Sequence, residues 1–248
     1  MAKLRGLDAG HGGADPGAAS CISGVWEKDL TLELVLMIDK RLRYNGFETA
    51  LTRADDKSPG DASDRGKFFA KNKVDFGLSI HFNAFSDASA NGTECYVPYG
   101  EKYGYAEKEI MQGFKEYFKL REPVCRSKNL NNQNEITDKQ LSFNTGLFGT
   151  VIKEKYDYFG VIRNAWGCGV SADLLEVCFA TSKKDMDIYI KNKEKIADII
   201  AGGIVRAYGG IYQKFPKAPS YKELYETEKA QKEKLINEIN GVIKKYGG

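Results

Sequence analysis

The chain contains two histidines, and each one follows a segment whose apolar residues predict a β-strand. His11 lies in the glycine-rich stretch LDAGHGGADPG, and His81 lies near the end of LSIHFNA. The carboxyl ends of parallel strands share one edge of an α/β sheet, where ligands bind. Imidazole nitrogen is a good zinc ligand, and catalytic zinc typically has three protein ligands and a water. The two histidines are therefore a candidate metal site, although each could instead be a solvated or hydrogen-bonded loop residue.

A third metal ligand is expected to be a carboxylate, because the five cysteines are scattered and include no Cys-x-x-Cys pair. Glu27 stands in the first turn of a predicted helix that follows the histidine loop, so its side chain could point back toward His11. Alternatively, Glu27 only interacts favourably with the positive N-terminus of that helix.

Glu176 lies within the mostly apolar stretch DLLEVCFA, which predicts a strand. A carboxylate is costly to bury without a partner, so Glu176 either forms an ion pair or acts as a general base with a raised pKa. Strand alternation would place Leu174, Glu176 and Cys178 on one face, and Leu175, Val177 and Phe179 on the other. Cys178 is therefore expected beside Glu176, where it could narrow the cleft or lie near the metal.

The glycines of residues 10–17 also invite comparison with a phosphate-binding loop. The stretch GHGGADPG contains neither GxxxxGKS/T nor a GxGxxG that leads directly into a helix. Pro16 and Gly17 interrupt the helix start that would hold a phosphate. A phosphate site is therefore the weaker hypothesis.

Apolar periodicity and turn residues predict alternating strands and helices. We expect strands at 3–8, 47–53, 74–82, 93–100 and 173–180, and helices at 27–46, 61–72, 102–120 and 183–207. This order predicts an α/β fold: a single domain with a mostly parallel mixed sheet flanked by helices on both faces, plus a C-terminal helical tail. The polar, asparagine-rich residues at about 121–158 are expected to be an insertion beside the sheet.

The chain changes character after residue 212. Residues 213–248 begin with a linker that contains two prolines and continue as a predicted helix, which could mediate self-association. Residues 1–212 would then form the main domain.

Composition excludes few partners. The 248 residues carry 37 Lys and Arg against 34 Asp and Glu, and this net charge of +3 is too small to favour nucleic acid. No run of eighteen apolar residues is present, so no membrane insertion is expected. The N-terminus lacks the apolar run of a signal peptide, and the cysteine pattern is typical of reduced thiols, so we expect synthesis in the cytoplasm.

Taken together, these motifs resemble the zinc-dependent N-acetylmuramoyl-L-alanine amidases of the AmiC/CwlV type, the Amidase_3 family. LDAGHGGADPGA and WEKDLTLEL are similar to that family's first zinc histidine and its zinc glutamate, and SIHFNA to its second zinc-histidine motif. ADLLEVCFAT looks like the strand that carries the family's catalytic glutamate. The resemblance implies one Zn²⁺ per chain, held by three ligands, with a separate catalytic residue. The implied metal ligands are His11, Glu27 and His81, and the implied catalytic residue is Glu176.

The resemblance covers about residues 3–208 apart from the insertion, and it adds two candidates for substrate binding. Asn83 occupies the family's asparagine position after the second histidine. Arg65, together with Arg53, matches the arginine-bearing stretch between the two histidine motifs. Departures from the family's usual pattern occur around the last strand, at Ser171, Asp173 and Cys178.

The implied activity is zinc-dependent hydrolysis of the amide bond between N-acetylmuramic acid and L-alanine in peptidoglycan. Such an enzyme degrades the bacterial cell wall, and the features above favour a phage or prophage endolysin over a bacterial autolysin. Two alternatives stay open. One is a zinc peptidase that acts on the peptidoglycan stem peptide, and the other is a wall-binding module without catalysis.

Overall fold

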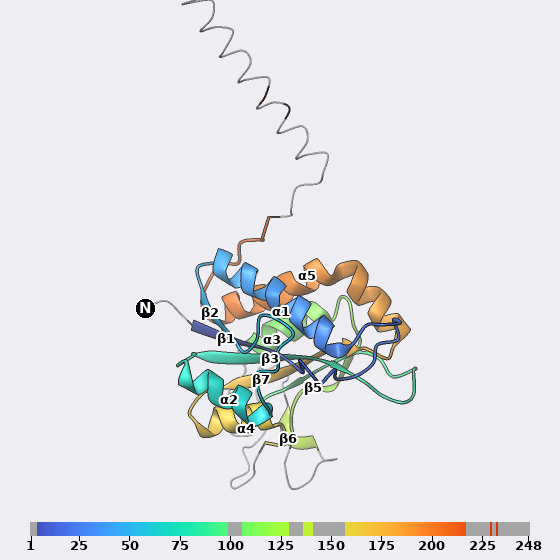
Figure 1. Ribbon diagram of the computed structural model, residues 1–248, viewed down its shortest axis with the longest axis horizontal. Coiled ribbons are helices and arrows are strands. Elements are labelled where there is room, and N and C mark those ends of the chain that lie inside the picture. The colour runs from blue at the N-terminus through green and yellow to red at the C-terminus, as the bar shows by residue number, and fades with distance from the viewer. Residues whose placement is uncertain are drawn as a thin grey trace, which may run out of the picture. The chain divides into compact units, whose positions relative to one another are not determined.

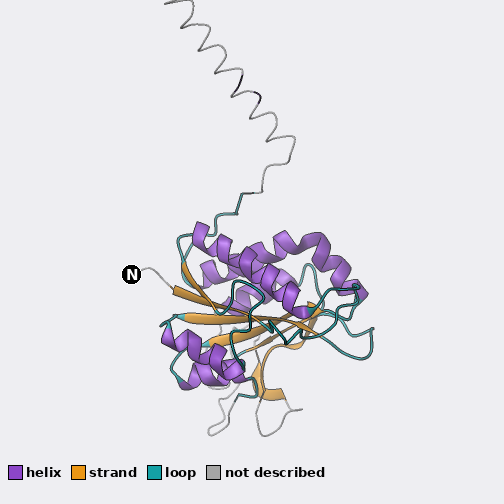
Figure 2. Ribbon diagram, in the orientation of Figure 1, coloured by secondary structure: helices purple, strands orange, loops and turns teal. Residues whose placement is uncertain are grey.

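The computed structural model describes residues 4–98, 106–128, 136–140 and 157–216, together with residues 229 and 232. These residues form a seven-stranded mixed sheet with helices on both faces (Figure 1, Figure 2). The strands are β1 (Leu4–Ala9), β2 (Glu48–Leu51), β3 (Phe76–Asn83), β4 (Thr93–Tyr96), β5 (Leu120–Lys128), β6 (Ile136–Gln140) and β7 (Ala172–Phe179). The helices are α1 (Glu27–Tyr44), α2 (Ala62–Lys71), α3 (Ala106–Phe114), α4 (Gly160–Gly167) and α5 (Lys183–Ala207).

The chain divides into two compact units, residues 1–214 and 215–248. All of the strands and helices named above belong to the first unit. Apart from Lys229 and Lys232, the predicted C-terminal helix lies outside the described residues. None of the described helices is both long enough and apolar enough to cross a membrane.

The strand order is β2-β1-β3-β7-β4-β5-β6. Strands β2, β1, β3 and β7 run parallel, whereas β4 is antiparallel to β7, β5 is parallel to β4, and β6 is antiparallel to β5. The carboxyl ends of β1, β3 and β7 therefore lie at one edge of the sheet, where the residues that follow them can meet. In the register of β3 and β7, His81 is the direct partner of Glu176.

The hydrophobic core is divided between the two faces of the sheet. Helices α1, α3 and α5 cover the larger apolar cluster, and α2 and α4 cover a smaller one on the other face (Figure 1). The predicted apolar side of α1 is at most 3% exposed at Leu30, Leu34, Ile38 and Leu42. Leu174 belongs to the smaller cluster, so Glu176, two residues further along β7, also projects toward the α2 and α4 face.

Most predicted elements are confirmed, and α5 has the predicted bounds. The helix predicted at 102–120 ends at Phe114, because Leu120 already begins β5. The prediction that residues 121–158 lie beside the sheet is wrong for β5 and β6, which extend the sheet beyond β4. Edge strands can form through main-chain pairing on one side, so the polar sequence of this segment does not predict them. Residues 141–156 lie outside the described residues, and α4 is an additional helix that the periodicity does not predict.

A β-bulge near the end of β7 changes which side chains face the sheet edge. Glu176 pairs with His81, but Phe179 pairs with Asn83, so β7 contains one extra residue between these two pairs. The expected alternation is lost there: Cys178 packs in the larger core, and Phe179 lines a cavity together with Asn83. The prediction that Cys178 shares the cleft with Glu176 is therefore wrong.

Candidate metal centre and active site

The loop after β1 holds His11 in a backbone conformation that non-glycine residues rarely adopt, with a φ of 62°. Two glycines keep the space around it clear. A Cβ at Gly10 would lie 2.4 Å from Cε1 of His81. A Cβ at Gly17 would lie 2.7 Å both from Cδ2 of His11 and from Oε2 of Glu27. The glycines are thus required by the close approach of three side chains.

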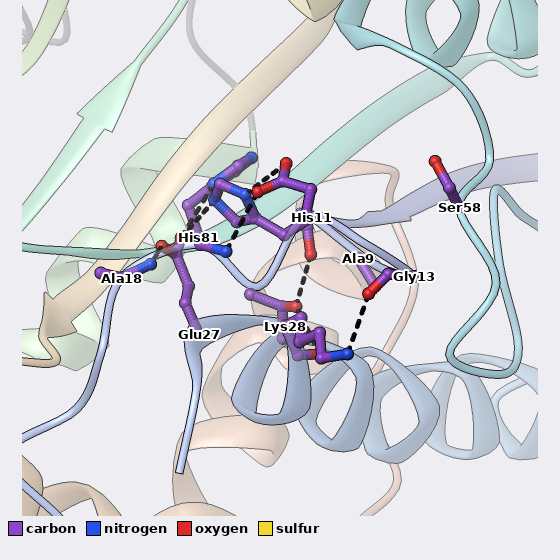
Figure 3. A network of polar contacts seen from close by, with 12 residues as sticks. Ala9, His11, Gly13, Ala18, Glu27, Lys28, Ser58 and His81 are labelled. Atoms are coloured by element: carbon purple, nitrogen blue, oxygen red, sulfur yellow. Dashed lines mark hydrogen bonds and ion pairs between the residues drawn. The ribbon is translucent and has the colours of Figure 1, made fainter. Parts of the chain in front are cut away.

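Those three side chains come from separate elements and converge at the carboxyl edge of the sheet (Figure 3). Nε2 of His11 and Nδ1 of His81 lie 3.1 Å and 3.0 Å from the same oxygen, Oε1 of Glu27. The two imidazole rings meet edge to face, with centroids 5.0 Å apart. One potential ligand atom from each residue lies within 4.8 Å of the other two. The structure therefore brings together the three residues that the sequence motifs single out as metal ligands.

Glu27 is fixed in place by main-chain donors. It is the first residue of α1 and is 5% exposed. Its Oε2 accepts a hydrogen bond from the amide of Ala18 at 3.0 Å, and its Oε1 accepts one from the amide of Phe82 at 3.0 Å. Burial acts to raise the pKa of Glu27, but the hydrogen bonds with both imidazoles outweigh it and hold the pKa well below its usual range. The carboxylate is therefore ionised, as a cation ligand must be.

The second nitrogen of His11 is held by Asp15, four residues further along the loop. Oδ2 of Asp15 lies 2.9 Å from Nδ1 of His11, and Oδ1 accepts a hydrogen bond from the amide of Gly17 at 3.1 Å. Burial acts to lower the pKa of His11, but the Glu27 and Asp15 carboxylates raise it overall. A carboxylate on the outer nitrogen orients an imidazole that binds a metal through its inner nitrogen. The sequence signal for this role is an aspartate within the same glycine-rich loop.

Two buried arginines hold the main chain of the histidine loop. Arg65 donates from Nη1 to the carbonyl of Ala9 at 2.7 Å and from Nη2 to the carbonyl of His11 at 2.7 Å. Arg53 donates from Nε to the carbonyl of Ala9 and from Nη2 to the carbonyl of Gly10, both at 2.9 Å. Arg65, a candidate for substrate binding, thus directs its guanidinium at the backbone that carries a metal-ligand candidate.

The charge of Arg65 is balanced by Asp8, a residue of β1 that is 0% exposed. Oδ1 of Asp8 accepts hydrogen bonds from Arg65 at 2.8 Å and from Thr52 at 2.5 Å, and Oδ2 accepts one from Ser79 at 2.6 Å. Burial acts to raise the pKa of Asp8, but the charge of Arg65 and the two hydroxyl groups lower it overall. No local pattern predicts this pair, because its members are 57 residues apart in the sequence.

Glu176 lies beside the candidate ligands as the strand neighbour of His81. Its Oε2 is buried and has no hydrogen-bond partner among the described residues. Burial, together with the negative charges of Glu27 and Glu94, raises the pKa of Glu176 well above its usual range. A carboxyl group with a buried, unpartnered oxygen is suited to accept and release a proton.

Two cavities flank the site. One has a volume of about 180 Å³ and lies between the two histidines and the N-termini of α2 and α4, with Phe159 and Leu174 in its lining. The other has a volume of about 240 Å³ and is lined by residues that include Asn83, Phe179 and Arg121. Asn83, the second candidate for substrate binding, thus lies outside the metal-ligand cluster and lines the larger of these two cavities.

A family model covers most of the chain. The model described as N-acetylmuramoyl-L-alanine amidase, Amidase_3, matches residues 6–206. The chain belongs to this family. The residues matched to Amidase_3 include the three converging side chains and Glu176.

Proteins similar to this chain come from phage and from bacteria. The chain is 38% identical to an endolysin of Bacillus phage SPP1 over 99 aligned residues. The aligned region makes up 39% of this chain and 35% of the endolysin. It is 37% identical to the sporulation-specific N-acetylmuramoyl-L-alanine amidase of Bacillus subtilis over 93 aligned residues. This aligned region makes up 37% of this chain and 34% of that protein. The chain spans half or less of the length of the first curated relatives it matches.

Solved structures share the fold of this chain. The catalytic domain of CwlV, an N-acetylmuramoyl-L-alanine amidase from Bacillus (Paenibacillus) polymyxa var. colistinus, has a TM-score of 0.57 at 27% identity, over 83% of this chain and 98% of that one. Cwp6 from Clostridium difficile has a TM-score of 0.62 at 28% identity, over 84% of this chain and 29% of that one. The α/β fold described above is therefore that of an amidase catalytic domain.

Proposed function

We propose that the chain is a zinc-dependent N-acetylmuramoyl-L-alanine amidase that acts on peptidoglycan at the bacterial cell wall. The bond to be cleaved is the amide between the lactyl group of N-acetylmuramic acid and L-alanine. The observation that carries the proposal is the convergence of His11, Glu27 and His81 next to Glu176, all within the residues that match the family model.

The converging side chains fit a zinc ion. Two imidazole nitrogens and a carboxylate oxygen form a known catalytic donor set that leaves a fourth position for water. Ligand atoms around zinc at about 2.0–2.1 Å lie roughly 3.3 Å apart in a tetrahedron. The observed distances of 3.0 Å and 3.1 Å from the histidine nitrogens to Oε1 of Glu27 are close to that spacing. Zinc held by these residues would lower the pKa of a water molecule to about 7 and polarise the amide carbonyl.

Glu176 is the proposed general base and general acid. Its carboxylate would accept a proton from the attacking water and then deliver that proton to the nitrogen of the departing L-alanine. The delivery is needed because an unprotonated amide nitrogen is a poor leaving group. The raised pKa of Glu176 favours the protonated form that delivers the proton. A cation at the three ligands would oppose this rise and favour the form that accepts it.

The remaining assignments are supporting proposals. Residues 1–212 are proposed as the catalytic domain, and residues 213–248 as a linker and a helix that supports self-association. Asn83 is proposed to contact the substrate, and Arg65 to act chiefly by holding the His11 loop. A phage or prophage endolysin is the proposed biological context, supported by the similarity to the SPP1 endolysin.

The products of digestion distinguish this function from the two alternatives. Purified peptidoglycan is incubated with zinc-loaded protein, and the fragments are identified by mass spectrometry. An amidase yields glycan strands without peptide and intact stem peptides that begin with L-alanine. Shortened peptides that stay attached to the glycan would instead identify a stem-peptide peptidase. Binding to the wall without any released fragment would identify a wall-binding module, and either result would overturn the proposal.

A further inference from the structure

An arginine lines the 240 Å³ cavity at the ends of β3 and β7. Arg121 lies at the start of β5 and lines this cavity with Asn83, Phe179 and Glu94. The hydrolytic step proposed above gives Arg121 no role. Among the described lining residues Arg121 is the one cation, and Asp87 and Glu94 are carboxylates.

The guanidinium of Arg121 is held on two sides. Its Nε forms an ion pair with Oε1 of Glu94, and its Cζ lies 5.0 Å from the centre of the Phe179 ring. Glu94 is 3% exposed, and its Oε2 accepts a hydrogen bond from the hydroxyl of Tyr96 at 2.8 Å. Because both oxygens of Glu94 have partners, this carboxylate anchors the guanidinium.

The two terminal nitrogens of Arg121, Nη1 and Nη2, are the atoms that would bind a ligand. Within the described part of the chain, the ion pair of Arg121 is made through Nε to Glu94, and the Phe179 ring lies beside the guanidinium. Burial raises the pKa of the nearby Asp185 carboxyl, and the charge of Arg121 acts to lower it. None of these interactions is a hydrogen bond from Nη1 or Nη2. The side chain is 38% exposed, so these nitrogens are accessible. An arginine anchored through Nε presents its two outer N–H groups as a fork that matches a carboxylate. Asp87, also in the cavity lining, accepts a hydrogen bond from the amide of Ser89 at 2.8 Å.

The position of Arg121 on the sheet sets the distance between its guanidinium and the bond that is to be cleaved. His81, Glu176 and Glu94 are successive partners across β3, β7 and β4. Neighbouring strands lie about 4.8 Å apart, so a guanidinium on Glu94 lies roughly 5–10 Å from Glu176. In peptidoglycan, L-alanine is followed by a glutamate that continues through its side-chain carboxyl. The α-carboxyl of that glutamate lies two residues along, roughly 7 Å from the cleaved amide.

We propose that Arg121 forms a subsite for the free α-carboxylate of the second residue of the stem peptide. This inference rests on the amidase function proposed above, and it also fixes the direction of the substrate. The peptide runs over β4 and β5, and the muramoyl group occupies the 180 Å³ cavity, where Phe159, Val161 and Leu174 form an apolar lining. Peptidoglycan in which this α-carboxyl is amidated loses the charge-assisted hydrogen bonds and is the poorer substrate.

Two defined muramoyl tripeptides that differ only in this group, carboxylate or carboxamide, test the proposal. For the zinc-loaded wild-type protein, kcat/KM should be roughly 10- to 100-fold higher for the carboxylate, the range for hydrogen bonds to charged groups. In Arg121→Gln this ratio should fall to within about threefold of unity. Arg121→Lys keeps the charge without the fork and should give an intermediate ratio. The control is Arg43→Gln, which removes an exposed arginine paired with Asp39 and should keep the wild-type ratio.

Equal kcat/KM for the two peptides with wild-type protein would overturn the subsite, as would an Arg121→Gln variant that keeps the full preference. The wild-type comparison needs no substitution, so a variant that folds poorly cannot obscure the result. Failure of the amidase function is distinct from failure of the subsite. In that case the wild-type protein would release no new L-alanine amino terminus from either peptide, which would overturn both proposals.

Discussion

Replacing Arg65 by methionine should destabilise the protein strongly, because it removes one charge from a buried pair. Arg65 is 7% exposed and Asp8 is 0% exposed, so water cannot replace the lost partner. Breaking a buried ion pair on one side costs about 3–5 kcal/mol. A domain has roughly 5–15 kcal/mol of free energy of unfolding in total. We therefore expect Arg65→Met to lose about 3–5 kcal/mol of the free energy of unfolding.

The same substitution should loosen the loop that carries His11. Arg65 donates hydrogen bonds of 2.7 Å to the carbonyls of Ala9 and His11, and methionine can donate neither. Loss of an outer contact that orients a metal ligand typically weakens metal binding about 10- to 100-fold. Arg65→Lys keeps a charge near Asp8 but cannot reach all three acceptors. It should therefore recover part of the stability while zinc affinity stays low.

The assays are urea unfolding of the metal-free proteins and zinc binding in competition with a chromogenic chelator. Arg206→Met is the matched control, because Arg206 is half-exposed and its ion pair with Glu109 should contribute at most about 1 kcal/mol. The double variant Asp8→Asn/Arg65→Met should lose at least about 1 kcal/mol less than the sum of the single variants. The reasoning would be refuted if Arg65→Met lost less than about 1 kcal/mol of the free energy of unfolding. It would also be refuted if the losses of the two single variants added up to the loss of the double variant.

The effect of Arg65→Met should also depend on pH. Burial acts to raise the pKa of Asp8, but Arg65 and two hydroxyl groups hold it below its ordinary value. A lowered folded-state pKa contributes stability above the unfolded value of about 3.9, and that stability is lost as the pH falls through the folded value. The difference in unfolding free energy between wild type and Arg65→Met should thus be largest near neutral pH and shrink in acid. A difference that grows in acid would contradict this role of Asp8.

Three further perturbations test the site itself. Gly10→Ala places a Cβ 2.4 Å from Cε1 of His81, and it should lower zinc affinity at least about tenfold in a chelator titration. Gly167→Ala meets nothing within 4 Å and should leave the affinity unchanged, so equal affinities for the two variants would argue against the role of Gly10. Asp15→Asn removes the carboxylate from Nδ1 of His11 and should weaken zinc binding about 10- to 100-fold with little change in Tm; wild-type affinity would disprove that contact's role. Treatment with EDTA should abolish peptide release from peptidoglycan and added zinc should restore it, whereas activity that survives complete metal removal would exclude the zinc mechanism.

The parts of the fold that the sequence predicts are those with strong apolar periodicity. Helices α1 and α5 and strands β1, β3 and β7 bury continuous apolar faces, so their positions can be read from residue spacing. Strands β5 and β6 and the bulge in β7 depend on pairing with distant residues. Local sequence carries little information about such pairing, so simple strand alternation places Cys178 on the wrong face.

The candidate site divides in the same way. Recognisable motifs at strand ends and at a helix start single out His11, Glu27, His81 and Glu176 from the sequence alone. The sequence does not single out the residues that hold them in place. The motif around Arg65 suggests substrate binding, and it gives no sign that the guanidinium turns inward to Asp8 and to the backbone of the histidine loop.

Zinc content and hydrolysis, measured on the same samples of wild type, Glu176→Ala and His81→Ala, test the central claim most directly. Bound zinc is quantified, and hydrolysis is followed as new L-alanine amino groups released from peptidoglycan. We predict one zinc per chain in wild type and in Glu176→Ala, with hydrolysis lowered at least about 10²-fold in Glu176→Ala. His81→Ala should lose both, because it removes one of the three converging side chains. Full hydrolysis by Glu176→Ala, or undiminished zinc and activity in His81→Ala, would contradict the proposed site.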